Sequence, residues 1–325
     1  MTHFRKKLAQ LGSDCEPKRW RFVAYDQLSD PSALLPPDSG EEVGLILCET
    51  LWKPRRRRYH KQKLALILAN QRQFALEQAH RGFPICYLTS EGDYASMLSG
   101  AAQKLGPIEV MEPAERELRV QLKGLIETGD IIPIENPFWM TTEDDFLTSQ
   151  GGRGDYRMDR FYRLVRKKYT ILVDQGGKPV GGKWSLDAQN REPWRGSPAA
   201  PVRPTFEHDE IDEEVFDLVR ERFADHPGVL RPEYLPTTQA HADALWEFAL
   251  EHCMELFGPY EDAMSRDEQH LFHTNISQVV NLNRLTPNRL IQDAIASGAR
   301  LNSVEGFVRQ ILGWREFVRH VHRET

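Results

Sequence analysis

Two patterns of apolar residues follow one another along the chain. In the first half, short apolar runs alternate with longer segments in which apolar residues recur every three to four positions. The short runs predict five strands, at 22–25, 44–48, 85–89, 108–111 and 131–134. Strands that alternate with helices are typical of a parallel sheet covered on both faces. The sequence therefore predicts an α/β domain with a Rossmann-like parallel sheet.

Two helices of this first half are well marked. Segment 61–80 carries an apolar stripe that includes Ile67, and Gly82 follows it as a C-terminal cap. Segment 115–128 repeats the arrangement and ends at Gly129. We expect the α/β domain to cover residues 1–147.

The pattern changes at about residue 148. A basic helix is predicted at 156–172, with arginines spaced three apart. The glycine- and proline-rich stretch 176–204 follows, and its two tryptophans, Trp184 and Trp194, favour docking against the protein surface over disorder. Residues 148–205 are therefore predicted to be a basic helix and an interdomain linker.

Strand patterns are absent after residue 204. Amphipathic helices are predicted at 213–223, 239–257, 287–296 and 304–320. The last one is preceded by Asn302 and Glu305, whose spacing suggests a capping box, and its apolar side runs from Val304 to Val318. Residues 206–325 therefore predict part of an all-α domain. We expect an uncovered apolar stripe to make this the least stable region.

Composition narrows the possible functions. The chain has 325 residues and a formal net charge of -6, so any nucleic-acid contact must come from local basic patches such as 55–58 or the helix at 156–172. No apolar run reaches the roughly 18 residues of a membrane span, and we expect a cytoplasmic protein with no membrane partner. The four cysteines are far apart and suggest neither a metal site nor a disulfide framework; they are Cys15, Cys48, Cys86 and Cys253.

Two carboxylates follow strands at the expected ligand-binding edge of the sheet. Asp26 comes after the first predicted strand and Glu49 after the second, and parallel strands place both at one edge. No GxGxxG or Walker loop accompanies them, so a dinucleotide or phosphate cradle is not predicted. From the residues alone, two roles of these carboxylates are equally open: they cap the loops that follow, or they contact a ligand.

Several motifs together resemble one family. Segment 304–317 reads VEGFVRQILGWREF, which is similar to the flavin-domain signature of photolyases and cryptochromes. The other matching segments, in chain order, are Asp26-Gln27-Leu28, Cys48-Glu49, His60-Lys61, RFYR at 160–163 and PVGGKWSLDAQNR at 179–191. Because the order is collinear over nearly the whole chain, the sequence resembles the iron-sulfur bacterial cryptochrome/photolyase family, also called prokaryotic (6-4) photolyases.

The resemblance implies a light-dependent DNA photolyase, a lyase that uses FAD to repair UV-induced pyrimidine lesions by electron transfer. It places four residues on the flavin, His273, Thr274, Ser277 and Asn281. It places Arg309 and Arg315 on the phosphates or the damaged strand. It places Trp314 at the floor of the lesion pocket, and Arg160, Arg163 and Lys183 on UV-damaged DNA. Asp26, Glu49 and Ile67 match residues around the family's lumazine antenna.

Departures from the family pattern alter these expectations. Lys53 and Arg56 replace the acidic and aromatic antenna residues, which argues against a lumazine pigment. No cysteine occupies a position expected of a 4Fe-4S ligand, and such a cluster needs four thiolates, so no metal site is predicted. The resemblance covers only the first part of the family's length. We therefore expect the chain alone to be inactive in repair. One partner compatible with the resemblance is a second polypeptide that completes the helical domain.

Two other hypotheses about the function stay open. One is a non-catalytic module that binds a small ligand or a partner and has lost FAD. The other is a nucleotide-binding enzyme of the broader Rossmann-like group, although the sequence offers no phosphate motif for it. Flavin absorbance of the purified protein separates the photolyase from the module, and stabilisation by ATP-like compounds would indicate the nucleotide enzyme.

Overall fold

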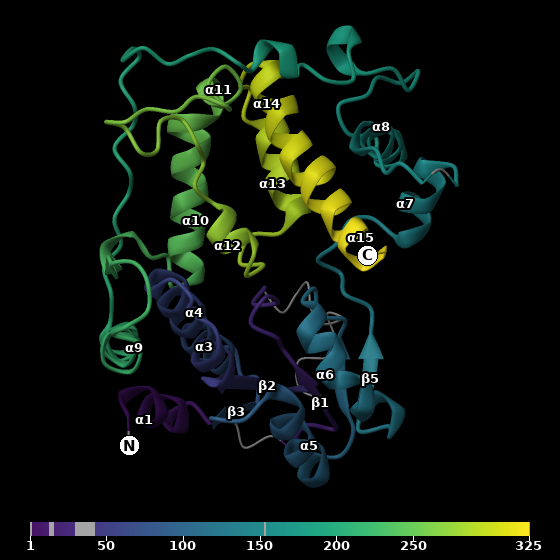
Figure 1. Cartoon of the computed structure of the whole chain (residues 1–325). Helices are drawn as coiled ribbons and strands as arrows, with labels where there is room; N and C mark the ends of the chain where they lie inside the picture. Colours follow the sequence, from purple (N-terminus) through teal and green to yellow (C-terminus); the bar gives the residue numbers. More distant parts are fainter. Residues whose placement is uncertain (1, 13–15, 30–42, 153, 325) are drawn as a thin grey trace. The chain divides into compact units, whose positions relative to one another are not determined.

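The computed structural model describes residues 2–12, 16–29, 43–152 and 154–324 (Figure 1). Cys15 lies outside the described residues. The chain forms two compact units that are interleaved in sequence. Unit 1 comprises Met1–Pro137, Thr205–Ala242 and Asn281–Arg284, and unit 2 comprises Phe138–Pro204, Asp243–Val280 and Leu285–Thr325. The sequence pattern had placed 206–325 in a single helical domain, whereas 205–242 packs within unit 1.

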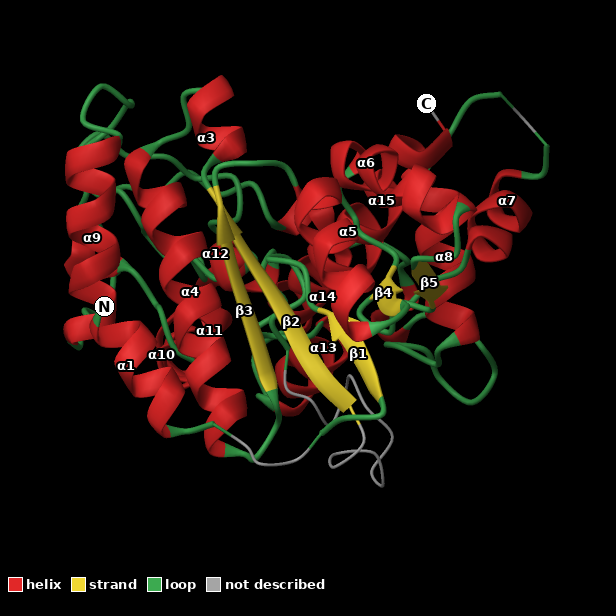
Figure 2. Ribbon diagram, turned by 90° about the horizontal axis from the view of Figure 1, so that it is seen from below, coloured by secondary structure: helices red, strands yellow, loops and turns green. Residues whose placement is uncertain are grey.

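Unit 1 contains a parallel sheet of five strands in the order β3-β2-β1-β4-β5 (Figure 2). The strands are β1 (Arg19–Phe22), β2 (Val43–Thr50), β3 (Ile85–Ser90), β4 (Ile108–Met111) and β5 (Ile131–Ile134). All eight residues of β2 are buried, as expected for an interior strand of a parallel sheet. The predicted fold is confirmed. The first strand was misplaced, because β1 ends at Phe22 instead of beginning there.

Helices cover this sheet. The helices of unit 1 are α1 (His3–Gln10), α3 (Trp52–Arg56), α4 (Lys61–His80), α5 (Tyr94–Leu105), α6 (Arg116–Glu127) and α9 (Glu210–Arg222). α9 belongs here because Val215, Phe216 and Val219 pack into one apolar cluster with the α4 residues Leu64 and Leu68. The sequence predicted α4 and α6 well but missed α1 and α5. In α5, many positions hold small residues, so the sequence shows no clear helical repeat of large apolar residues.

Unit 2 is helical in the described residues. Its helices are α7 (Glu143–Gln150), α8 (Met158–Lys168), α10 (Gln239–Phe248, whose first four residues belong to unit 1), α11 (Met254–Phe257), α12 (Ser277–Val280), α13 (Pro287–Ala296), α14 (Leu301–Val308) and α15 (Glu316–Glu324). π-helical segments at Ala249–Cys253 and Arg309–Arg315 join α10 to α11 and α14 to α15. Such wide turns are frequent at functional sites.

Two expectations about the last helix were wrong. Asn302 and Glu305 form no capping box, because the helix already begins at Leu301 and both residues lie inside it. Most of the expected apolar stripe is also covered within unit 2. Of its seven members, only Trp314 and Val318 are exposed, at 43% and 55%, and the others are buried, namely Val304, Phe307, Val308, Ile311 and Leu312.

The linker is docked on unit 2. Arg166 of α8 is fully buried and donates hydrogen bonds to the carbonyls of Ile171, Leu172 and Trp184. Trp194 packs in a second cluster with Tyr260 and Phe272. This agrees with the docking that the two linker tryptophans suggested. Among the described residues, no helix combines the length and apolarity needed to cross a membrane.

Candidate functional site

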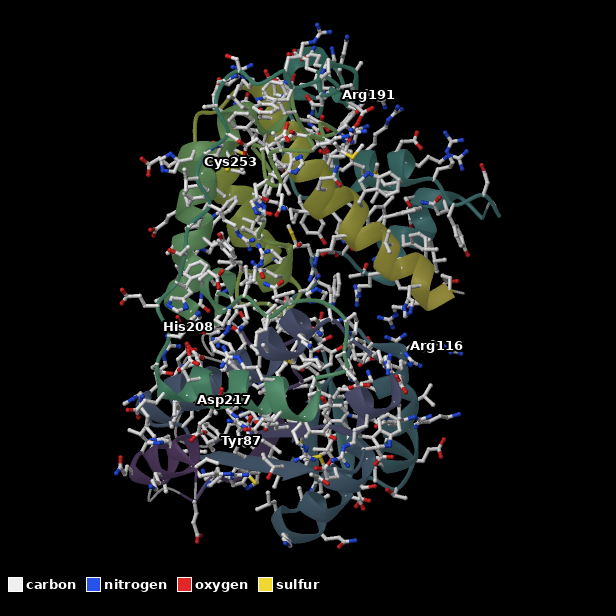
Figure 3. All side chains as sticks on the ribbon, turned by 60° about the vertical axis from the view of Figure 1, so that its left-hand side comes forward. Tyr87, Arg116, Arg191, His208, Asp217 and Cys253 are labelled. Atoms are coloured by element: carbon white, nitrogen blue, oxygen red, sulfur yellow. The ribbon has the colours of Figure 1, made fainter. Side chains whose placement is uncertain are left out.

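A groove of about 380 Å³ lies in unit 2, between α8, the linker and the Arg309–Arg315 turn. Its walls hold three aromatic side chains, Tyr162, Trp184 and Trp314, and its arginines include Arg163 and Arg191. Arg191 can be located in Figure 3. The remaining lining residues are Met158, Asp159, Ser185, Asp187, Glu261, Asp262, Arg309 and Gln310. The structure therefore gathers three residues that the sequence singled out, Arg163, Arg309 and Trp314.

The groove depends on close packing of α8 against the π-helical turn. A Cβ atom built on Gly313 would lie 3.2 Å from the sulfur of Met158 and 3.3 Å from the ring of Tyr162. Glycine thus permits the close approach that places Tyr162 beside the turn. Trp314 directly follows Gly313 and presents part of its indole ring to the groove.

Arg309 lies under the groove and is enclosed by carboxylates. Its Nη1 atom lies 3.1 Å from Asp187, its Nη2 atom 3.3 Å from Glu261, and its Nε atom 3.5 Å from Glu305. Only 6% of Arg309 is exposed. The guanidinium is therefore engaged inside the protein, and it is not presented at the surface as a phosphate ligand would be.

The basic residues around the groove have different environments. Arg160 lies 3.4 Å from Asp155, a pair at the protein surface. Arg163 and Lys183 are exposed, and in the part of the chain that the structure describes neither has an ion-pair partner. Lys167 lies 5.4 Å above the ring of Trp184. Positive side chains thus stand near the partly buried Trp184 and the exposed Trp314, and sites that bind single-stranded nucleic acids combine the same two kinds of side chain.

The residues expected to hold the flavin are not brought into a phosphate cradle in unit 2. His273 and Thr274 line a space of about 10 Å³, room for one water molecule, and His273 Nε2 lies 3.3 Å from the Tyr260 carbonyl. Ser277 is exposed, and the helix it begins, α12, is a single turn of four residues. Asn281 belongs to unit 1 and is exposed.

Arg315 is also occupied by neighbouring side chains. Its guanidinium stacks 3.9 Å above the ring of Trp139 and lies 3.4 Å from Glu316. The carboxylate of Glu316 is fully buried and accepts hydrogen bonds from Thr141. As arranged, the unit 2 residues carried over from the family do not fit a flavin pyrophosphate, and we derive no chemistry through that group.

The antenna residues likewise have protein partners. The carboxylate of Glu49, which is 5% exposed, accepts two hydrogen bonds from Arg72 and one from Tyr87. Lys53 forms ion pairs with Glu115 and Glu117, and burial lowers the Lys53 pKa. Asp26 follows β1 at the same sheet edge as Glu49, as predicted, and its backbone carbonyl accepts from Asn283. Ile67 packs against the α4–α9 cluster. Glu49 is therefore a structural residue here, and the site does not fit the family's pigment.

The described cysteines are packing residues. Cys48 and Cys253 are buried, and burial raises the pKa of the Cys253 thiol to about 12. Burial also raises the pKa of the Cys48 thiol. Within the described residues, no group of three or more His, Cys, Asp or Glu side chains is placed to hold a metal ion.

Sequence reasoning missed the acidic residues of the groove, including the two that pair with Arg309. Asp187 lies in a motif whose resemblance was noted, but its charge was not used. Glu261 follows a Gly-Pro turn and carries no local signal; only the fold brings it to Arg309.

Comparison with known proteins agrees with this architecture. A bacterial class III photolyase structure from Agrobacterium tumefaciens matches with a TM-score of 0.52 at 13% identity, covering 95% of this chain and 60% of that one. The fold is therefore that of a photolyase-like protein, a parallel α/β sheet followed by a helical region.

Sequence comparison identifies the family of this chain. Residues 21–234 match the deoxyribodipyrimidine photo-lyase-related protein family, and the chain belongs to it. A (6-4) photolyase from Agrobacterium fabrum is 32% identical over 315 residues, which are 93% of this chain and 62% of the relative. An uncharacterised mimivirus protein, R852, is 27% identical over 143 residues, 42% of this chain and 72% of that protein. The chain thus spans about three fifths of the photolyases it matches.

Proposed function

We propose that this chain binds UV-damaged DNA through the groove of unit 2, as a relative of the (6-4) photolyase. The observation that carries the proposal is the presence of Trp184 and Trp314 in one groove with Arg163, which has no ion-pair partner among the described residues. Indole rings stack on nucleobases of any sequence, and guanidinium groups neutralise phosphates.

Damaged DNA suits such a groove better than intact duplex. A base must leave the helical stack before it can contact an aromatic wall, and this costs a few kcal/mol in an intact duplex but less at a lesion. The net charge of -6 gives little general attraction for DNA, so that the local contacts decide binding.

The proposed ligand is DNA that carries UV-induced pyrimidine lesions, and the (6-4) photolyase from Agrobacterium fabrum is the relative that suggests it. The proposal does not route electron transfer through any described residue. A non-catalytic binding module is the second candidate, and the internal partners of Arg309 and Arg315 favour it. Flavin absorbance of the purified chain distinguishes the two candidates.

The test compares binding of one labelled oligonucleotide before and after UV irradiation, by fluorescence anisotropy. We expect the irradiated strand to bind more tightly, and Trp314→Ala to weaken that binding by about tenfold, since stacking is worth roughly 1–3 kcal/mol per base. Val318→Ala is the matched control, because Val318 is exposed on the next turn and lies outside the groove. Equal binding of both strands, or equal loss in both variants, would refute the proposal.

A further inference from the structure

Arg309 connects the two walls of the groove. It lies in the same π-helical turn as Trp314, five residues away, and its Nη1 atom lies 3.1 Å from Asp187, three residues after Trp184 in the linker. Its Nη2 atom lies 3.3 Å from Glu261, in the loop after α11. One planar guanidinium therefore holds three separate segments of unit 2.

A second set of hydrogen bonds strengthens the same connection. The Glu305 carboxylate accepts from the backbone N–H of Leu186 at 2.8 Å. Asn190 of the linker donates to Glu261 at 3.0 Å and to the Asn302 carbonyl at 3.1 Å. Gln310 also donates to Glu261. The linker thus meets Arg309 and its carboxylates at three positions, 186, 187 and 190.

The charge around Arg309 opposes a phosphate. Three carboxylates surround Arg309, and one of them, Asp187, also pairs with the exposed Arg191. The cluster is therefore still formally negative, and Arg309 is 6% exposed. A phosphate entering the cluster would meet three like charges at short range, in a poorly solvated place. Arg309 therefore differs from Arg163, which is exposed and without an ion-pair partner in the described residues.

We infer that Arg309 is a positioning residue that fixes the spacing of the Trp184 and Trp314 walls and does not itself contact nucleic acid. The inference rests on the proposed function of the groove. Lysine would not replace Arg309, because a single ammonium group lacks the fork that reaches several carboxylates at once.

The salt dependence of binding separates positioning from phosphate contact. Each phosphate contact to single-stranded DNA contributes about 0.7 to the slope of log K against log[salt]. We expect Arg163→Met to reduce that slope by about one contact. Arg309→Met and Arg309→Lys should weaken binding of an irradiated oligonucleotide by about tenfold and leave the slope unchanged.

A double-mutant cycle tests whether the connection to the linker is what matters. Asp187→Asn is milder than Arg309→Met and keeps the fold measurable if the latter does not fold. In the presence of Arg309→Met, Asp187→Asn should cause little further loss of affinity, because the contact between the two residues is already gone and the other pair of Asp187, with Arg191, is exposed. Arg300→Met is the control, since Arg300 forms an exposed pair with Glu255 in the same unit.

Limited proteolysis provides a readout that does not depend on DNA. Both Arg309→Met and Asp187→Asn should be cleaved faster in segment 176–204 than the wild-type chain. If the wild-type chain binds no DNA, the proposed function fails. Faster linker cleavage in the two variants would still support the connection between Arg309 and the linker, and unchanged cleavage would refute it. A reduced salt slope in Arg309→Met, or additive losses in the cycle, would show direct contact and overturn the inference.

Discussion

The guanidinium of Arg72 donates two hydrogen bonds to the carboxylate of Glu49, from Nη2 at 2.7 Å and from Nε at 2.8 Å. This ion pair ties β2 to α4, and the hydroxyl of Tyr87 on β3 adds a third bond at 2.6 Å. Both charged side chains are less than one tenth exposed. A pair this deeply buried is costly to break from one side.

We therefore expect Arg72→Met to lower the free energy of unfolding by about 3–5 kcal/mol, because it leaves the Glu49 carboxylate buried without its partner. Replacing both residues, as Glu49→Leu with Arg72→Met, should recover much of that loss. Arg58→Met is the control, since Arg58 and Asp225 form an exposed pair, whose removal costs about 0–1 kcal/mol. Urea unfolding followed by circular dichroism measures all three. Equal effects of the Arg72 and Arg58 changes would show that Glu49 is not held by Arg72.

Arg163 and Arg166 form a second test, one turn apart on α8. Arg166→Met removes the donors to three carbonyls and should destabilise the chain by about 3 kcal/mol or more, since each buried unsatisfied acceptor costs roughly 1–3 kcal/mol. Arg163→Met should leave stability unchanged within about 0.5 kcal/mol, because Arg163 is exposed. Thermal unfolding and protease resistance of the linker measure the difference. The reverse order of effects would contradict the structure.

Gly306 lies where the linker approaches α14. A Cβ atom at this position would come within 2.6 Å of the Asn190 side chain and 2.9 Å of Glu261. Gly306→Ala should therefore destabilise unit 2 by about 1–3 kcal/mol and loosen the linker. Gly124→Ala in α6 is the control, because nothing lies within 4 Å of its Cβ position, and it should stabilise by about 1 kcal/mol. A stabilising effect at Gly306 would show that the linker does not pack there.

His320 predicts a dependence of stability on pH. The ring is 3% exposed, stacks on Phe146 and lies 2.9 Å from the Thr141 hydroxyl. Burial, with Arg319 and Arg323 nearby, lowers its pKa to about 4, whereas Asp145 acts in the opposite direction. Between about pH 6.5 and 4 the unfolded chain binds the extra proton, so stability falls as the pH is lowered, by up to about 3 kcal/mol.

His320→Gln should flatten this part of the pH profile, whereas His322→Gln, at an exposed position, should not. Burial raises the pKa of Glu316, which gives a slope of the opposite sign as pH rises above about 4.5. The comparison is therefore made between variants, from urea midpoints at several pH values. A wild-type profile identical to that of His320→Gln would rule out the histidine as its origin.

The sheet could be predicted because its signals are local. Buried parallel strands read as apolar runs, and Gly82 and Gly129 end α4 and α6 with φ of 89° and 81°. The first strand was placed three residues late, since Phe22–Tyr25 is as apolar as the strand itself. The capping box at Asn302 failed because both polar side chains instead serve the linker, Asn302 through Asn190 and Glu305 through Leu186.

The groove could be predicted only in part. Motif resemblance singled out Arg163, Arg309 and Trp314, but it gave Arg309 a phosphate role that its position beside Asp187 and Glu261 does not support. Those two carboxylates lie 122 and 48 positions away from Arg309 in sequence. No periodicity or spacing records such contacts, since they depend on how the linker docks.

The central claim is that DNA binds along the groove, and hydrogen–deuterium exchange of the chain with and without an irradiated oligonucleotide tests it most directly. We expect added protection in segments 157–163, 183–191 and 309–315, which line the groove. Segments 3–10 and 208–211, which line a separate surface hollow in unit 1, are expected to be unchanged. Protection of that hollow with no change at 183–191 and 309–315 would contradict the account.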